Sequence, residues 1–147
     1  MSGLAPVSEE ALDEILSRPR PETIDALRHC PGDIIVLGAG GKMGPTLARM
    51  ATRAAHDADG REPRRVIAVS RFASPHMRES LASHGVETIS ADLLDGAAVA
   101  RLPDAANVIY MAGQKFGTTD APARTWMMNV VVPAHCALGL LRRSHPV

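Results

Sequence analysis

The chain has 147 residues, of which 16 are basic and 16 acidic, so it carries no net formal charge, and its length is typical of a single domain. With 46% apolar and 22% charged residues, the composition is that of a globular protein and excludes a disordered or fibrous class. Its aromatic residues are one Trp, one Tyr and two Phe, with no basic stripe beside them. We therefore expect no nucleic-acid partner, because such proteins need stacking platforms and a positive footprint.

The first 32 residues predict two short helices that form an appendage to a main domain at 33–147. Ser8 is typical of an N-cap, and the two glutamates that follow it suit a first helical turn. Pro21 suits the first turn of a second helix, which Pro31 and Gly32 end.

The N-terminal segment is acidic, which differs from a secretory signal, and no apolar run approaches the roughly 20 residues that span a bilayer. We expect a cytoplasmic protein without a membrane partner.

Beyond residue 32, short apolar runs alternate with segments of helical period. The runs are DIIVLG, RVIAVS, VETIS and NVIYMAG, which is typical of strands buried on both faces. The alternation predicts a doubly wound, Rossmann-type α/β fold: a parallel sheet of about four strands in the order 3-2-1-4, with helices on both faces. In that order the fourth strand lies at an edge without protecting charge or proline, so we expect a homo-oligomer.

A long final helix is expected from Pro122, with a kink near Pro133 because proline cannot donate the backbone hydrogen bond there. Its predicted buried stripe consists of Trp126, Met127, Val130, Ala134, Ala137, Leu138 and Leu141. Cys30 and Cys136 have no CxxC spacing, and we interpret both as small, buried, reduced residues.

The strongest chemical signal is IIVLGAGGKMGPTLARM, in which a strand leads into a glycine-rich turn and then a helix. Gly38, Gly41 and Gly44 are three residues apart, whereas the commoner G-x-G-x-x-G fails because its last position is Met43. Glycine allows the tight turn, the close approach of backbone to a pyrophosphate, and close packing of the helix, whose free N–H groups favour phosphate. A purely structural turn needs only one or two glycines, and a P-loop lacks support because Lys42 is not followed by Ser or Thr. The predicted cofactor-binding loop comprises Gly38, Gly40, Gly41, Lys42, Met43 and Gly44.

The end of the second strand bears on the choice of cofactor. An acidic residue there binds a ribose 2′-hydroxyl, whereas an arginine accommodates a 2′-phosphate. This chain has Ser70 and Arg71 there, while Asp57 and Asp59 lie in a polar loop before the strand. The position favours NADP(H) over NAD(H), with a solvated surface arginine as the alternative.

The strand ending in GAGGKMG resembles the extended short-chain dehydrogenase/reductase superfamily, specifically the NAD-dependent epimerase/dehydratase family, over Asp33 to about Leu141. The resemblance implies an adenine contact after the third strand, small residues behind the nicotinamide-side ribose after the fourth, and a helix asparagine that braces the backbone. The matching residues are Asp92 and Leu93; Met111, Ala112 and Gly113; and Asn129. Alternatives remain: Asp92 as a helix N-cap, Met111 as an ordinary core residue, and Asn129 on the surface. Val132 and Pro133 also replace the family's Gly-Thr.

The family's catalytic Y-x-x-x-K pair is absent. Tyr110 is the only tyrosine, the residue four positions after it is Gln114, and Lys115 comes one position too late. The six histidines show no metal spacing, so we expect neither catalytic nor metal-binding residues here. The expected explanation is a C-terminal truncation. The leading interpretation is the cofactor-binding part of an NAD(P)-dependent oxidoreductase or epimerase/dehydratase, which transfers hydride at a hydroxyl or carbonyl carbon of a small-molecule substrate. The alternatives are a non-catalytic NADP(H) sensor and a Rossmann-like domain that has lost its ligand.

Overall fold

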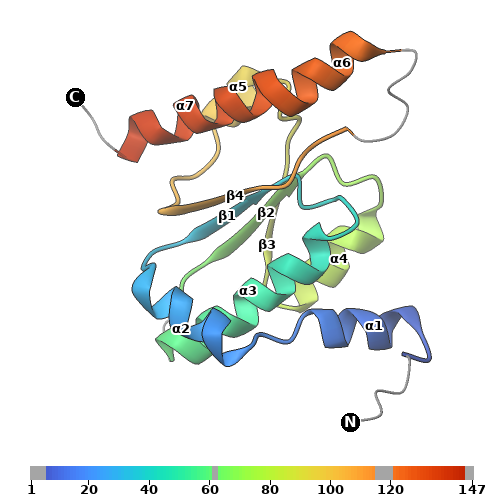
Figure 1. The fold of residues 1–147 in the computed structure, drawn as a ribbon, viewed down its shortest axis with the longest axis vertical. Coiled ribbons are helices and arrows are strands. Elements are labelled where there is room, and N and C mark those ends of the chain that lie inside the picture. Colours follow the sequence, from blue (N-terminus) through green and yellow to red (C-terminus); the bar gives the residue numbers. More distant parts are fainter. Residues whose placement is uncertain (1–5, 61–62, 115–120, 145–147) are drawn as a thin grey trace.

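A four-stranded parallel sheet forms the centre of the computed structural model, which describes residues 6–60, 63–114 and 121–144, with side chains as far as residue 140 (Figure 1). Its order is β3-β2-β1-β4, and every neighbouring pair is parallel. The expected α/β fold, strand order and two-sided helix cover are thereby confirmed. The strands are β1 (Ile34–Leu37), β2 (Val66–Ser70), β3 (Glu87–Ser90) and β4 (Asn107–Tyr110).

The strand register brings the carboxyl ends of the strands together. Leu37 at the end of β1 is paired with Val69 of β2 and with Tyr110 of β4, while Ser70 of β2 is paired with Ser90 of β3. The loops that follow the four strands therefore leave the sheet along one edge, where ligands of open α/β sheets bind.

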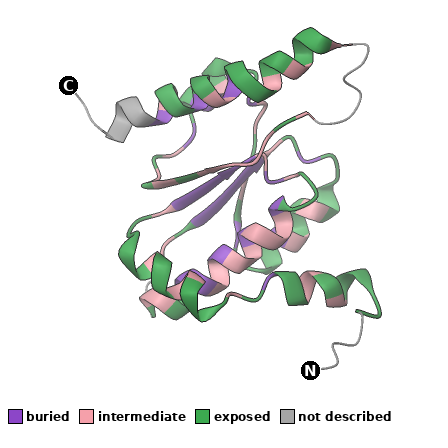
Figure 2. Ribbon diagram, viewed as in Figure 1, coloured by how far each residue is buried: buried purple, intermediate pink, exposed green. Residues whose placement is uncertain are grey.

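Alternate residues of the two central strands face opposite layers, and both faces are buried (Figure 2). Ile34 and Val36 face the core under α3, whereas Ile35 and Leu37 face the core under α5 and α7. This two-sided burial explains the continuous apolar runs in the sequence. The helices are α1 (Glu9–Leu16), α2 (Pro21–His29), α3 (Gly44–Asp59), α4 (Pro75–Ser83), α5 (Gly96–Ala100), α6 (Pro122–Trp126), the π-helical turn η1 (Met127–Val131) and α7 (Val132–Ser144).

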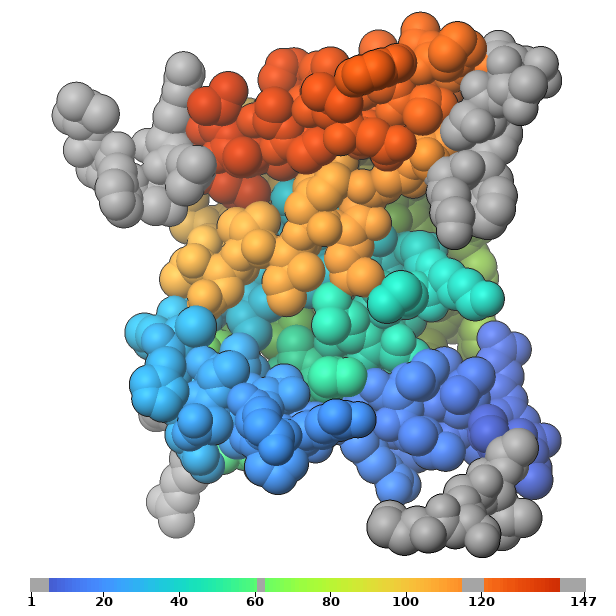
Figure 3. Space-filling model, in the orientation of Figure 1, coloured from blue at the N-terminus to red at the C-terminus, as the bar shows by residue number. Residues whose placement is uncertain are grey.

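The N-terminal helices pack against α3, on the side of the molecule opposite α6 and α7 (Figures 1 and 3). Ser8 caps α1 as expected, because its Oγ accepts the Ala11 N–H at 3.1 Å. Glu14 accepts hydrogen bonds from Arg49 (3.4 Å) and Arg53 (2.6 Å) of α3, and mainly the Arg53 bond lowers the pKa of this carboxyl to about 2. The appendage is thus an extra layer on α3, in which ion pairs hold α1 and Leu27 of α2 packs against the core.

The set of residues predicted to be buried on the C-terminal helix is wrong. The residues turned to the core are Val132, Cys136 and Leu140, whereas Trp126 is 68% exposed and Met127, Val130, Ala134, Ala137 and Leu138 are exposed too. Leu141 lies outside the described side chains. In η1, just before Pro133, the Val132 N–H donates to the Met127 carbonyl, five residues back. The disturbance expected near Pro133 therefore takes the form of a π turn, a known response to an interrupted helical ladder.

Two smaller expectations also change. Cys30 is exposed and only Cys136 is buried. Asp57 and Asp59 belong to α3, and Asp59 accepts two hydrogen bonds from the Arg64 guanidinium, from Nε at 2.7 Å and from Nη2 at 2.5 Å. These bonds lower the pKa of Asp59 to about 2 and anchor the start of β2.

Among the described helices, none combines the length and apolarity required to cross a bilayer.

Candidate functional site

A groove of about 220 Å³ lies at the carboxyl edge of the sheet. The segments that follow all four strands contribute to it, together with one residue of η1. This is the topological switch point of the sheet, between β1 and β4, from which the connections run to opposite faces. The lining residues are Gly38, Gly40, Gly41, Ser70, Arg71, Ala91, Asp92, Leu93, Met111, Ala112, Gly113 and Met128.

Two of the loop glycines, Gly38 and Gly44, are required because backbone packs against them, and Gly40 packs against a side chain. Gly38 has φ +85°, and a Cβ there would lie 2.6 Å from Ala112 Cα. A Cβ on Gly44 would lie 2.5 Å from the carbonyl carbon of Ala39, and one on Gly40 would collide with Ser70 Oγ. Real Cβ atoms do not approach backbone this closely, so Gly38 and Gly44 let β1, β4 and α3 meet.

Gly41 is different, because the fold leaves room for a side chain there. A Cβ at this position would touch only the Gly38 carbonyl oxygen, at 3.5 Å, which is an ordinary contact. The residue is exposed and lines the groove. The internal packing therefore does not require a glycine at position 41. The absence of a side chain there keeps the loop backbone accessible from the groove.

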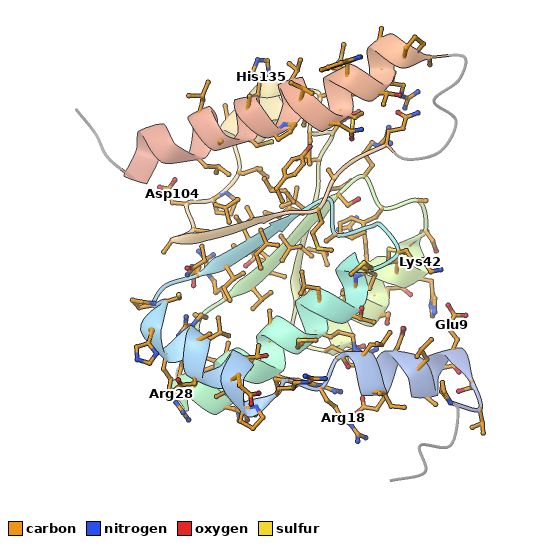
Figure 4. The ribbon with its side chains drawn as sticks, viewed as in Figure 1. Glu9, Arg18, Arg28, Lys42, Asp104 and His135 are labelled. Carbon is orange, nitrogen blue, oxygen red and sulfur yellow. The ribbon has the colours of Figure 1, made fainter. Side chains whose placement is uncertain are left out.

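The loop also offers backbone donors. Gly38 and Ala39 donate to the Val69 carbonyl, but the N–H groups of Gly40, Lys42 and Met43 have no acceptor among the described residues. The first turn of α3 has neither a capping side chain nor an acidic residue, and in Figure 4 Lys42 lies at this end of the helix. Unpaired donors at a positive helix terminus suit an anion such as a phosphate.

The end of β2 places a cation at the groove. The Arg71 side chain is 64% exposed, and its Nη1 lies 3.9 Å from Asp92 Oδ2 after β3. Asp92 does not cap α5, since that role falls to Asp95, whose Oδ1 accepts the Ala97 N–H at 2.9 Å. The groove thus holds one positive and one negative side chain from adjacent strands.

The end of β4 forms the other wall. The Met111 N–H donates to the Leu37 carbonyl at 2.8 Å, which continues the β1–β4 pairing to the groove. Asn129 of η1 accepts from the Gln114 N–H at 2.9 Å and donates to the Gln114 carbonyl at 3.1 Å. The side chain is exposed, yet it braces the chain just beyond Gly113, so both interpretations of Asn129 hold in part.

The structure brings most of the sequence-predicted residues together at the groove. Lys42, Met43, Gly44 and Asn129 do not line it: Met43 is exposed, Gly44 is buried in packing, and Asn129 acts on the neighbouring backbone. Sequence reasoning missed Ala91 and Met128. Each is adjacent in the chain to a predicted residue, and that adjacency was the only available signal.

Acid–base groups are few at this site. The Tyr110 hydroxyl donates to the Met128 carbonyl at 3.1 Å, and burial, with a smaller contribution from the nearby Cys136, raises the pKa of this phenol to about 12. Lys115 lies outside the described residues. Within 6–60, 63–114 and 121–144, no group of three or more His, Cys, Asp or Glu residues could hold a metal ion.

Comparison with known proteins yields similarity at the level of the fold. No family model matches the chain, and no curated protein matches it. Among solved structures, the chain is similar to Pen from Bacillus thuringiensis, with a TM-score of 0.55 and 14% sequence identity over 73% of this chain. The match covers 33% of the Pen chain, so the present chain spans about one third of that protein's length.

Proposed function

We propose that this chain binds a dinucleotide cofactor in the groove, NADP(H) in preference to NAD(H), as the cofactor-binding part of a hydride-transferring oxidoreductase or epimerase/dehydratase. The single observation that carries the proposal is Gly41. A glycine that packing does not require, on a loop with unpaired N–H donors at the start of a helix, is what a pyrophosphate needs.

The preference for NADP(H) rests on Arg71. Its exposed guanidinium lines the groove at the end of β2, where the 2′ position of an adenosine ribose lies in dinucleotide-binding folds. A guanidinium binds a phosphate through bidentate, charge-assisted hydrogen bonds, which a ribose hydroxyl cannot match. Asp92 lowers the net positive charge there, so the preference is expected to be moderate.

A bound nicotinamide cofactor would supply hydride transfer, while the described residues would bind and orient it. Tyr110 is an unsuitable acid or base, because its hydroxyl is engaged with the Met128 carbonyl and its pKa of about 12 keeps the proton on the oxygen near neutral pH. This arrangement favours a second candidate, a non-catalytic module that binds NADP(H) and acts through a partner.

The test is calorimetric titration of the purified chain with NADPH and with NADH, repeated for Gly41→Val. We expect tighter binding of NADPH and loss of binding of both cofactors in Gly41→Val, because the valine would occupy the path to the loop backbone. Gly96→Val is the matched control, since a Cβ at Gly96 meets nothing within 4 Å and this residue does not line the groove. Absence of binding by the wild-type chain, or wild-type affinity in a folded Gly41→Val variant, would refute the proposal.

A further inference from the structure

Arg71 and Asp92 face each other across the groove, one after β2 and one after β3. Their closest charged atoms are 3.9 Å apart, and both residues line the groove. This separation is too long for a hydrogen bond but short enough for a direct charge interaction. With side chains 64% and 44% exposed, the pair is weak, so a ligand could separate it at little cost.

The backbone on both sides of this pair is fixed. The Ala91 N–H donates to the Ser70 carbonyl at 3.0 Å, which joins the residues that precede Arg71 and Asp92. Phe72, directly after Arg71, is buried in the core although it has φ +46°, a conformation that side-chain-bearing residues adopt at a cost. The buried ring holds the chain in this conformation, and the Arg71 side chain is left at the surface.

Asp92 is also constrained. Its Oδ1 accepts the Leu94 N–H at 3.0 Å, and its other oxygen, Oδ2, is the one nearest Arg71. One carboxylate oxygen is thus held by the local turn while the other faces the arginine. The local turn therefore positions the carboxylate beside the guanidinium.

We propose that Asp92 is a specificity-determining residue that limits the preference for a 2′-phosphate by competing with it for Arg71. This inference rests on the proposed function, because it concerns the same groove. A 2′-phosphate that reaches Arg71 must displace the Asp92 carboxylate and then lie close to its negative charge, whereas a 2′-hydroxyl meets neither penalty. Asp92 therefore weakens binding of the phosphorylated cofactor selectively.

The expected effect can be stated as a ratio of affinities. An exposed ion pair such as Arg71–Asp92 shifts an equilibrium by up to about fivefold, and a 2′-phosphate that takes Arg71 forfeits this contribution. Asp92→Asn should therefore raise the affinity for NADPH relative to NADH by about this factor. Any contact of Asp92 with the part common to both cofactors cancels in the ratio.

The experiment measures dissociation constants of NADPH and NADH by calorimetry for wild type, Asp92→Asn, Arg71→Ala and the double variant. Asp95→Asn is the matched control: it removes a neighbouring carboxylate outside the groove, and asparagine is an equally good N-cap. We expect the affinity ratio to rise in Asp92→Asn, to stay unchanged in Asp95→Asn, and to respond much less to Asp92→Asn when Arg71 is already alanine.

The outcomes separate the two proposals. If wild type binds neither cofactor, the proposed function fails, and this inference fails with it. If wild type binds but Asp92→Asn leaves the ratio unchanged, only the role of Asp92 is overturned. An equal rise with and without Arg71 would show simple repulsion of the phosphate and would overturn the competition for the arginine.

Discussion

Gly44, the first residue of α3, allows the glycine loop and α3 to pack together, and Gly44→Ala tests how far the fold depends on that contact. The added methyl group would lie 2.5 Å from the carbonyl carbon of Ala39 and 2.6 Å from its Cα, and closer still to its oxygen. All of these are backbone atoms, so no flexible side chain can move aside. Either α3 or the loop after β1 must shift.

The size of the effect follows from two opposing contributions. Overpacking a well-packed site costs about 1–3 kcal/mol, and the upper end applies because backbone must move. Replacing glycine by alanine in a helix returns up to about 1 kcal/mol. Gly96→Ala isolates this second contribution, since Gly96 also begins a helix, α5, and has open space around it. Because the second contribution is common to both variants, we expect their unfolding free energies to differ by the overpacking cost, about 2–3 kcal/mol.

The assay is urea unfolding at neutral pH followed by circular dichroism. With a slope of about 2 kcal/mol per molar urea, the midpoint of Gly44→Ala should lie roughly 1–1.5 M below that of Gly96→Ala. Equal midpoints for the two variants would refute the argument, because they would mean that α3 and the Ala39 backbone are not in close contact.

Three further predictions concern single side chains. Tyr110 is the only tyrosine, so absorbance near 295 nm during alkaline titration should report a pKa of about 12; a transition near 10 in the folded protein would contradict its burial. Asp59→Asn should lower the unfolding free energy at pH 7 by about 1–2 kcal/mol, because the native carboxyl has its pKa near 2 instead of 3.8. That contribution is present above pH 4 and is lost as the pH falls toward 2, so wild type and variant should converge there in unfolding measurements; a constant difference across this range would argue against the pair. Cys30 should react with a maleimide well before Cys136, whose thiol is buried and has a raised pKa, and mass spectrometry of the labelled peptides would reveal the reverse order if it occurred.

The features that the sequence predicted correctly are those in which local pattern and tertiary structure agree. Ile34 to Leu37 are apolar at every position because both faces of β1 are covered, and the glycines after them mark where the backbone packs most closely. Strand order follows from the short right-handed connections of such a fold. Most groove residues were predicted for a related reason, since they lie at or shortly after the carboxyl ends of the strands.

The prediction of which face of the C-terminal helix is buried was wrong for a physical reason. The helix carries two apolar faces, one with Val130 and Leu138 and one with Val132 and Cys136, and periodicity alone does not say which faces the sheet. The π turn before Pro133 shifts the register between them. The short distance between the Arg71 and Asp92 side chains likewise could not be predicted from the sequence. The separation of two side chains that follow neighbouring strands depends on register and turn geometry.

The position of α3 between two layers has a consequence for the loop that precedes it. Small residues, Ala48, Ala51, Ala54 and Ala55, are buried along this helix, which has the sheet on one side and α1 with α2 on the other. A helix enclosed in this way loses its freedom of movement when the protein folds, and the glycine loop is tied to its first turn through Gly44 and to β4 through Gly38. A ligand that arrives at the groove therefore meets a loop whose conformational entropy has already been lost. Its binding free energy would go into contacts instead of ordering the chain, which is the basis of preorganised recognition.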